Sequence, residues 1–169
     1  MTEPITTSAS RVRQVEAIAN GTVIDHIPPA MTLKVAALLT GTEDQVFIGA
    51  NLRSSRMGRK GVVKISNREI SPHEASCLAL IAPTATVCII RDFSVVTKQP
   101  VPVPERFDDV ARCANPNCVT NHERWPTRFV VVRGPSEARS AAPIEVPLRV
   151  RCVYCERGFA AGELALLDR

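Results

Sequence analysis

The residues with the clearest chemistry are four cysteines in two short pairs, Cys113-x4-Cys118 and Cys152-x2-Cys155. A spacing of two to four residues lets both sulfurs of a pair point from one tight turn toward one ion. Two such turns complete the tetrahedral thiolate set that zinc prefers, and no coordination position is left for water. The spacing therefore predicts one structural Zn2+ ion without a catalytic role.

Other interpretations of the cysteines stay open at this level. The four could be disulfides or plain buried thiols, a rubredoxin-like iron site would have the same geometry, and His122 could replace one ligand. Two paired spacings in a chain expected in a reducing compartment favour a metal. Cys77 and Cys88 each stand alone in an apolar stretch, so they are predicted to pack as small buried side chains.

Composition limits the classes of protein to consider. The chain has 169 residues, of which 45% are hydrophobic and 22% charged, which favours one or two small globular domains over disorder. A net charge of +4 is too small for the dense basic surface of a general nucleic-acid binder. The first residues lack the apolar segment of a secretory signal, so residues 1–12 are expected to be a flexible arm and the location cytoplasmic.

The N-terminal half alternates strand and helix patterns. Strand-like residues from Gln14 surround an Asn20-Gly21 turn signal, and a helical pattern follows from Met31 to Leu39. Strands are predicted at Gln45–Leu52 and Val62–Ser66, with Arg53–Lys60 as a basic connection. These patterns place the first helix between the first two strands.

A second helix and a hairpin follow. Ser71 as N-cap, Pro72 at the first helical position and Glu74 at the capping-box position predict a helix that stops before Pro83. The runs Thr86–Ile90 and Phe93–Thr97 predict a hairpin that turns at Arg91-Asp92. The whole order predicts a ferredoxin-like, split βαβ domain, with two helices on one face of an antiparallel sheet and the other face free.

The C-terminal part reads as a separate domain. Prolines at every second position of Gln99–Pro104 favour an extended spacer. We therefore expect an α+β protein with domains at 13–99 and 105–169, joined by a linker at 100–104. The second domain is expected to be a small β-rich zinc ribbon, with strands at Arg128–Arg133 and Ile144–Arg151 around a loop at Gly134–Pro143.

Several segments resemble one known family in order along the chain. Gln14–Pro28 and Met57–Ile65 closely resemble the regulatory chain of aspartate carbamoyltransferase, and Ala82–Val87, Pro104–Val110 and the cysteine set continue the likeness. The resemblance covers roughly residues 13–159. It implies a non-catalytic regulatory chain that pairs as a homodimer and bridges catalytic trimers through its zinc domain, in pyrimidine biosynthesis. It also implies ATP, CTP and UTP as allosteric effectors.

The resemblance also assigns a nucleotide site residue by residue. Lys64 and Lys98 would meet the triphosphate, as two ammonium groups suit a compact polyanion. Asp25 would take the ribose hydroxyls, His26 would lie near the phosphates or ribose, and Lys60 matches a lysine that serves a second nucleotide in some members. Backbone groups around Val15, Glu16, Ile18 and Ile90 would read the base, with Val23, Val62 and Val95 as apolar walls.

Three positions depart from the family pattern. Cys88 and Phe93 stand in the site where an asparagine and a tyrosine are found in the enteric form, so hydrogen bonding to the base is reduced. Arg56 replaces an acidic residue, which weakens the case for a metal-bridged second nucleotide. Two other classes of protein fit the sequence less well: a zinc-ribbon nucleic-acid binder, for which the region is too near neutral, and an enzyme, for which no catalytic motif is present.

Overall fold

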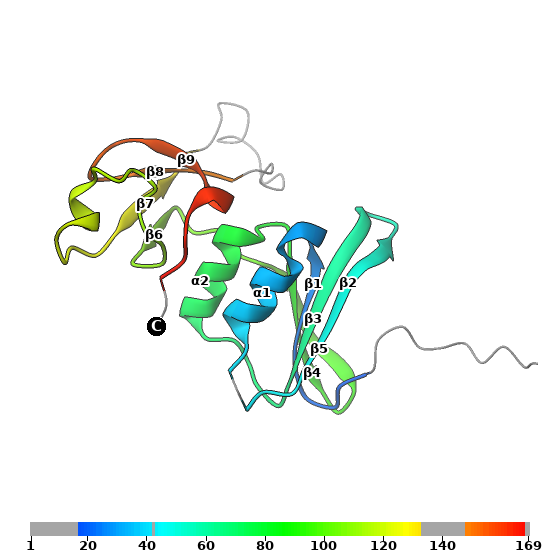
Figure 1. The fold of residues 1–169 in the computed structure, drawn as a ribbon. Coiled ribbons are helices and arrows are strands. Elements are labelled where there is room, and N and C mark those ends of the chain that lie inside the picture. Colours follow the sequence, from blue (N-terminus) through cyan, green and yellow to red (C-terminus); the bar gives the residue numbers. More distant parts are fainter. Residues whose placement is uncertain (1–16, 42, 133–147, 168–169) are drawn as a thin grey trace, which may run out of the picture.

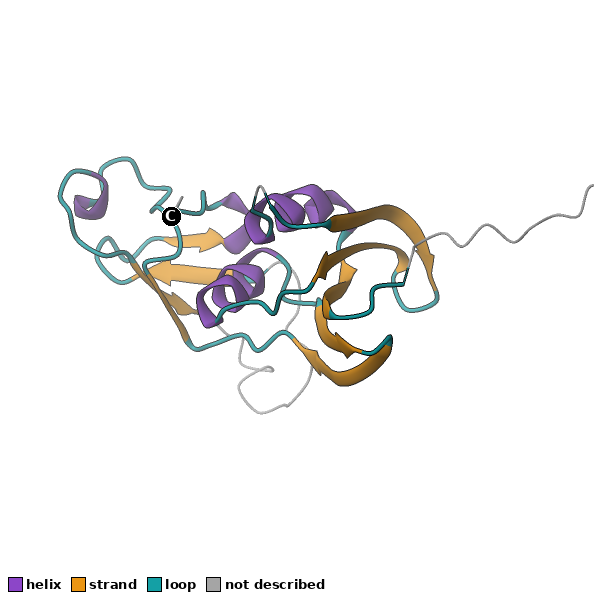
Figure 2. Ribbon diagram, turned by 90° about the horizontal axis from the view of Figure 1, so that it is seen from below, coloured by secondary structure: helices purple, strands orange, loops and turns teal. Residues whose placement is uncertain are grey.

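The computed structural model describes residues 17–41, 43–132 and 148–167, which form two antiparallel sheets with helices between them (Figures 1 and 2). The strands of the larger sheet are β1 (Gly21–Ile27), β2 (Val46–Ser54), β3 (Gly58–Ser66), β4 (Thr86–Arg91) and β5 (Ser94–Pro100). Their order is β2-β3-β1-β4-β5, and every pair of neighbours is antiparallel. This is the predicted ferredoxin-like arrangement with β5 added at one edge.

Helices α1 (Thr32–Leu39) and α2 (Pro72–Ile81) cover one face of the larger sheet (Figure 1). Alternation along the strands decides which residues meet them. Ile24, Val63 and Ile65 are fully buried in the main apolar cluster, whereas Val23 and Lys64, their sequence neighbours, point to the other face. That second face carries the residues of functional interest.

The start of α2 was correctly predicted because its signals are local. The Ser71 side chain accepts a hydrogen bond from the Glu74 N–H, and the Glu74 carboxylate accepts one from the Ser71 N–H. This capping box satisfies two backbone donors that would otherwise lack partners. Helix α1 starts at Thr32 rather than Met31, because Pro29–Met31 form a separate 3-10 turn.

The predicted basic connection between β2 and β3 is mostly strand, so that expectation was wrong. Arg53 lies in β2 opposite Arg59 in β3, and Lys60 is opposite Leu52. Only residues 55–57 form the turn. Hydrogen bonds between the two strands continue through these residues, so Lys60 becomes part of the sheet. The basic composition of the segment gives no sign of this pairing.

The β4–β5 turn is also displaced from its predicted place. Arg91 belongs to β4, and the turn is formed by Asp92 and Phe93, whose φ angles are 48° and 59°. Two left-handed residues match the twist of a two-residue hairpin. Phe93 is therefore a turn residue and not the first residue of a strand.

The Pro-rich segment is less independent than its composition suggests. Strand β5 continues to Pro100 at the sheet edge, where a missing N–H is tolerated. Val101 is only 4% exposed, and its N–H donates to the Ala85 carbonyl at 3.0 Å. The start of the predicted spacer is thus packed against the larger sheet.

The smaller sheet has the order β6-β7-β8-β9 and contains two strands that sequence patterns did not reveal. Its strands are β6 (Arg106–Asp108), β7 (Arg128–Val131), β8 (Arg149–Cys152) and β9 (Gly158–Ala160). The missed strands, β6 and β9, are three residues long, too short for a periodic signal. The predicted loop Gly134–Pro143, and the first residues of the strand expected from Ile144, lie outside the described residues.

The two sheets share one continuous apolar cluster. It runs from Leu78 and Ile81 of α2 to Phe107, Phe129 and Val150 of the smaller sheet. Helix α2 also contacts the 3-10 turn η4 (Ala161–Glu163). The larger sheet, which carries the candidate nucleotide face, and the smaller sheet, next to the cysteines, are therefore connected through packed apolar side chains.

Candidate metal centre and nucleotide-binding face

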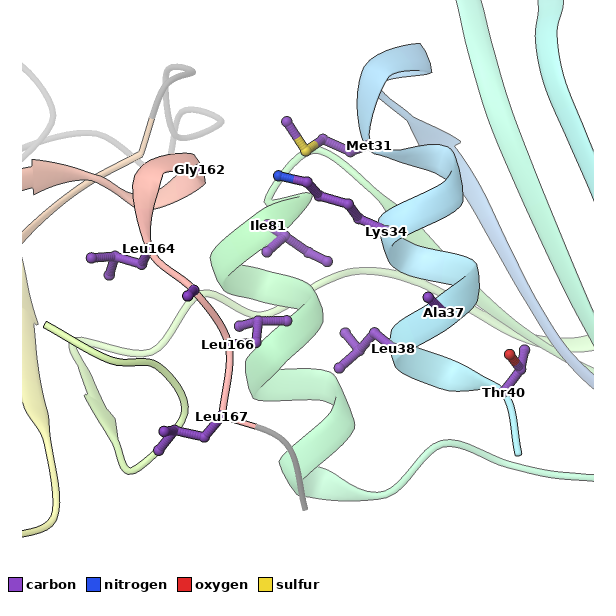
Figure 3. Close-up of a pocket in the computed structure, with 11 residues that line it drawn as sticks. Met31, Lys34, Ala37, Leu38, Thr40, Ile81, Gly162, Leu164, Leu166 and Leu167 are labelled. Atoms are coloured by element: carbon purple, nitrogen blue, oxygen red, sulfur yellow. The ribbon is translucent and has the colours of Figure 1, made fainter. Parts of the chain in front are cut away.

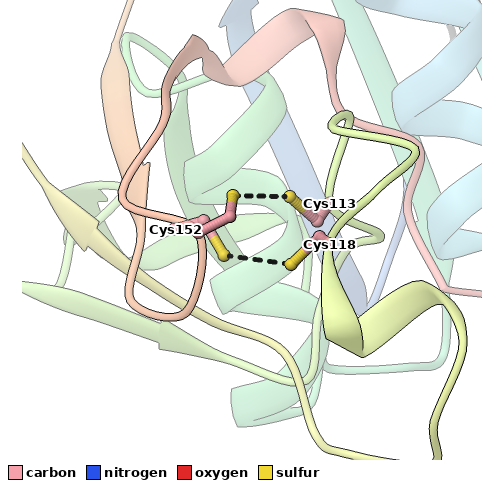
Figure 4. A group of neighbouring side chains, drawn as sticks. Cys113, Cys118 and Cys152 are labelled. Carbon is pink, nitrogen blue, oxygen red and sulfur yellow. Dashed lines mark hydrogen bonds between the residues drawn. The ribbon is translucent and has the colours of Figure 1, made fainter.

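The four paired cysteines converge on one point (Figure 4). Cys113 Sγ lies 3.6 Å from Cys155 Sγ, Cys118 Sγ lies 3.9 Å from Cys152 Sγ, and all four sulfurs lie within 4.8 Å of one another. Four sulfurs at about 2.3 Å from a central ion would be about 3.8 Å apart at the corners of a tetrahedron. The cluster therefore fits one tetrahedral metal ion.

Backbone turns aim these sulfurs. The Cys118 N–H donates to the Asn115 carbonyl at 3.0 Å, and the Asn121 side chain donates to the carbonyls of Cys113 and Asn115. On the other turn, the Cys152 N–H donates to the Arg157 carbonyl at 3.0 Å. Both pairs are thus held by local hydrogen bonds.

Burial, hydrogen bonds and neighbouring sulfurs set the acidity of these thiols. Burial, together with neighbouring sulfurs, raises the pKa of the Cys113 thiol. At Cys155 burial also favours the neutral thiol, but hydrogen bonds, chiefly from the Arg157 N–H, lower its pKa to about 7. Four sulfurs this close resist joint ionisation, and a divalent cation removes that resistance by binding the thiolates.

The other candidate ligands do not join the cluster. His122 is exposed, and its Nε2 lies 2.9 Å from the Pro116 carbonyl oxygen. Cys77 and Cys88 are 1% and 7% exposed, as predicted for small apolar side chains. Cys77 Sγ also lies 3.5 Å from His73 Nε2 on α2.

Strand register brings four of the residues that the resemblance assigns to the nucleotide site into one row on the open face of the larger sheet. Val23 is opposite both Lys64 and Cys88, and Cys88 is opposite Lys98. Directly opposed residues point to the same face, so the two lysines flank Val23 and Cys88. Phe47, opposite Lys64, extends the row by one position. The sequence analysis did not assign Phe47 to the site, because the sequence does not show that β2 pairs with β3 in this register.

Asp25 and His26 lie where β1 departs from regular pairing. The register of β1 with β3 shifts between Ile24 and Ile27, and His26 has a φ of 59°. Such a bulge turns side chains away from the ladder. It places the Asp25 carboxylate 2.7 Å from Lys60 Nζ, and the His26 N–H donates to Asp25 Oδ1 at 2.7 Å.

The charges of this group act on one another. Burial favours the neutral acid at Asp25, but the Lys60 ammonium and the His26 N–H outweigh it and lower the pKa of the carboxyl. The pKa of His26 is also lowered, first by burial and then by Lys60, Arg56 and Lys98, against the opposing pull of Asp25. Burial raises the pKa of the Cys88 thiol. At neutral pH the group therefore comprises a paired carboxylate, ammonium groups, a neutral imidazole and a neutral thiol.

A small apolar cluster borders this charged group. Ile18, Cys88 and Ile90 are buried together, with Val23 and Phe47 packed against them. Ile18, Phe47 and Phe93 also line a pocket of about 310 Å³ at the end of the sheet. A flat apolar wall beside grouped cations suits a ligand that has an aromatic part and an anionic part.

The remaining assigned residues are distributed differently. Val62 is buried at 7% exposure, whereas Val95 is 58% and Phe93 70% exposed. Phe93 nevertheless approaches the face through its backbone, because its N–H donates to the Ala19 carbonyl at 2.9 Å. Val15 and Glu16 lie outside the described residues.

A second hollow, of about 520 Å³, lies between α1 and the C-terminal segment (Figure 3). Leu38, Ile81, Leu164 and Leu166 contribute apolar walls, and the Lys34 ammonium lies at its upper end. The hollow contains none of the cysteines and none of the charged residues of the open face. It marks a loosely filled part of the contact between the two helices and the C-terminal segment.

Fold and sites together define a class: a two-part protein with a ferredoxin-like domain that presents a cationic face, and a β-rich domain whose four cysteines are able to hold one metal ion. No helix in the described ranges is long and apolar enough to cross a membrane. Residues 13–102 match the family model of the aspartate carbamoyltransferase regulatory chain, allosteric domain, and residues 105–165 match that of its metal binding domain.

Individual relatives agree with these matches. The chain is 43% identical to the aspartate carbamoyltransferase regulatory chain of Pyrococcus abyssi over 155 residues, which are 89% of this chain and 95% of that relative. It is 43% identical to that of Methanopyrus kandleri, over 92% of this chain and 96% of the relative. Its identity to that of Porphyromonas gingivalis is also 43%, over 90% and 95%. The chain belongs to the family of aspartate carbamoyltransferase regulatory chains and is not itself catalytic.

Proposed function

We propose that this chain binds nucleoside triphosphates on the open face of its larger sheet and passes the signal to a catalytic partner through its metal domain. The row of Lys64, Val23, Cys88 and Lys98 carries the proposal. Two ammonium groups on either side of an apolar strip offer charge to phosphates and a flat surface to a base or ribose. Asp25 keeps free acceptor positions for ribose hydroxyls, since a carboxylate accepts more bonds than Lys60 and His26 use.

Effectors are proposed by class from the family resemblance. ATP, CTP and UTP share the triphosphate that the lysines would hold, so they would compete for one face. Cys88, in the middle of the row, is buried, and its thiol is a weak hydrogen-bond donor. Discrimination between bases would therefore come mainly from backbone groups.

The metal is proposed to be zinc, held by Cys113, Cys118, Cys152 and Cys155. Four thiolates and tetrahedral spacing suit zinc better than metals that prefer oxygen ligands. Iron would satisfy the same geometry, and elemental analysis of purified protein separates the two. Thiolate ligands must stay reduced, so a cytoplasmic location is proposed with the metal.

The proposed contact with the catalytic chain is the exposed side of the metal domain. Trp125 and Tyr154 pack edge to face at 6.5 Å between ring centres, and Trp125 is 56% exposed. Val119 and Val153, beside the cysteine turns, are 39% and 45% exposed. Aromatic and aliphatic side chains exposed together are typical of protein interfaces. Bridging of two catalytic trimers would then need a second regulatory chain.

A homodimer would provide that second chain, and β2 is the proposed contact. It is an edge strand of nine residues without proline, and Ile48 is 48% exposed. The other edge, β5, ends in Pro100, which disfavours strand addition. Sedimentation of Ile48→Lys, which should be monomeric, tests the contact; an unchanged dimer would place it elsewhere.

The central test mixes the full chain with its catalytic subunit and measures aspartate saturation with and without ATP, CTP or UTP. We expect a nucleotide-dependent change that Lys64→Ala and Lys98→Ala reduce. Lys34→Ala, a lysine on α1, is the matched control for nucleotide binding and should leave it unchanged. Full nucleotide response in both variants would exclude the phosphate assignment.

The signal is proposed to travel through the contact between α2 and the C-terminal segment. Ile81 of α2 and Leu164 lie in the shared apolar cluster, so movement of one sheet must be accommodated by the other. An Ile81→Ala variant should keep nucleotide binding and lose part of the response of the catalytic subunit. Equal loss of binding and response would contradict this path.

A further inference from the structure

The hollow between α1 and the C-terminal segment combines apolar walls with an opening to solvent (Figure 3). Its volume of about 520 Å³ lies within the range of small-molecule pockets. Among the residues that line it, Ile81 and Leu164 are buried at 8% and 6% exposure, whereas Ala37 and Gly162 are exposed. The hollow therefore has an apolar floor that a ligand can reach from solvent.

Hydrogen bonds to residues 110–112 hold the C-terminal segment in place. The Arg112 N–H donates to the Ala165 carbonyl at 2.7 Å, and the Leu167 N–H donates to the Val110 carbonyl at 3.0 Å. These bonds tie the segment to the metal domain and not to α1. Moving the segment toward α1 to close the hollow would break them, and lost backbone hydrogen bonds are costly. The space is therefore preformed.

One positive charge lies at this hollow. Of the 11 lining residues, Lys34 is the one with an ionisable side chain, and its ammonium lies at the upper end of the hollow (Figure 3). Lys34 is exposed on α1, and among the described residues no carboxylate forms an ion pair with it. A ligand in the hollow would thus meet a long apolar surface and a single cation.

We propose that this hollow binds a fatty acid, with the carboxylate at Lys34 and the alkyl chain between α1 and the C-terminal segment. One carboxylate matches one ammonium, and Leu38 and Leu166 offer the chain apolar contact without needing hydrogen bonds. A nucleoside triphosphate fits less well, because its several charges would meet one cation and no aromatic side chain lines the hollow. Fatty-acid binding here does not depend on nucleotide binding at the open face.

A bound alkyl chain would lie where the two parts of the protein meet. Ile81 and Leu164 line the hollow and also belong to the apolar cluster that the two sheets share. Packing against both residues adds contact between the helices and the C-terminal segment. Because a ligand that binds only the folded chain stabilises it by mass action, a fatty acid should also raise the temperature of thermal unfolding.

Isothermal titration calorimetry of the full chain with decanoate tests the site. We expect saturable binding of one decanoate per chain, with an affinity that rises about fourfold for each methylene added between hexanoate and decanoate. Lys34→Gln should weaken decanoate binding by about two- to fivefold, because a partly solvated ion pair is lost. The same variant should leave the binding of decanol, the matched uncharged ligand, unchanged.

Two further variants locate the binding. Ala37→Phe should abolish it, because the ring would occupy the hollow from α1. Lys98→Gln removes a lysine of the open face and should bind decanoate as wild type does. Circular dichroism of each variant checks the fold.

Three results would overturn the proposal. Equal decanoate affinity in wild type, Lys34→Gln and Ala37→Phe would place any binding elsewhere. An equal effect of Lys34→Gln on decanoate and decanol would remove the carboxylate from Lys34. Binding by the full chain that disappears in its complex with the catalytic subunit would show that this partner, and not a fatty acid, covers the hollow.

Discussion

The side chain of Arg68 joins three segments that are separate in sequence. Its Nη1 donates to both oxygens of Glu74 at 2.8 and 3.0 Å, and Nη2 donates to the Leu39 carbonyl at the end of α1. Its Nε lies 3.3 Å from Asp44 Oδ2, and its carbonyl accepts from the Thr22 hydroxyl at 2.8 Å. One guanidinium therefore fixes the end of α1, the following loop and the start of α2.

Replacement of Arg68 by Met keeps most of the aliphatic stem and removes the donors. Loss of hydrogen bonds to a charged group costs about 1.5–3 kcal/mol, and a fully buried unpaired partner would cost about 3–5 kcal/mol. Water reaches part of this site, because the Arg68 and Glu74 side chains are 31% and 20% exposed. We expect Arg68→Met to lower the free energy of unfolding by about 2 kcal/mol, after discounting for that exposure.

Urea unfolding of the full chain, followed by circular dichroism, measures the loss. Arg106→Met is the matched control, since Arg106 pairs with Asp108 at 60% and 43% exposure and should cost about 0.5 kcal/mol or less. If Arg68→Met costs no more than the control, the guanidinium does not hold the three segments together.

The same pair predicts an acid dependence. Burial favours neutral Glu74, but the Ser71 N–H and the Arg68 guanidinium outweigh it and lower the pKa of the carboxyl. A group with a lower pKa in the folded state contributes stability above its unfolded pKa and loses it as pH falls through the folded pKa. Stability should therefore fall less steeply from about pH 5 to about pH 3 in Arg68→Met than in wild type.

Three further predictions concern the two sheets. Gly21→Ala should lower the free energy of unfolding, measured by thermal unfolding, by more than about 2 kcal/mol. Its φ is +131°, and an added Cβ would clash with the Ile65 carbonyl oxygen. An unchanged stability would show that β1 can shift to make room for the methyl group. Phe129→Ala should cost about 3–5 kcal/mol, since Phe129 is fully buried opposite Phe107, and a cost near 1 kcal/mol would mean that the smaller sheet closes the cavity. Removal of the metal with a chelator should unfold the smaller sheet and release the catalytic subunit while nucleotide binding persists; an unchanged complex would separate the metal from assembly.

Local sequence signals were sufficient for several features. The capping box at Ser71 and Glu74 acts within four residues, so the start of α2 was correctly predicted. The cysteine pairs are likewise local, because each pair lies on one turn.

Other features depend on contacts between distant residues. The two strands of the β2–β3 hairpin were predicted, but their ends, Arg53–Lys60, were predicted as a basic connection, because the ladder that extends to Ser54 and Gly58 exists only when the strands meet. The turn at Asp92 and Phe93 is favoured by the twist of the two strands, although phenylalanine rarely adopts a positive φ. Strands β6 and β9 are fixed by their partners rather than by their own pattern.

By itself, the sequence determined the pairing of the four cysteines into a candidate metal site, most of the alternation of helix and strand, and the resemblance that pointed to the family. These follow from spacing within a few residues, where backbone geometry leaves little choice. Tertiary structure alone decided that Lys60 meets Asp25 across 35 positions, that Lys64 and Lys98 share a row, and that a bulge turns His26 among them. Register sets all three, since a shift of one residue would send each strand's side chains to the opposite face.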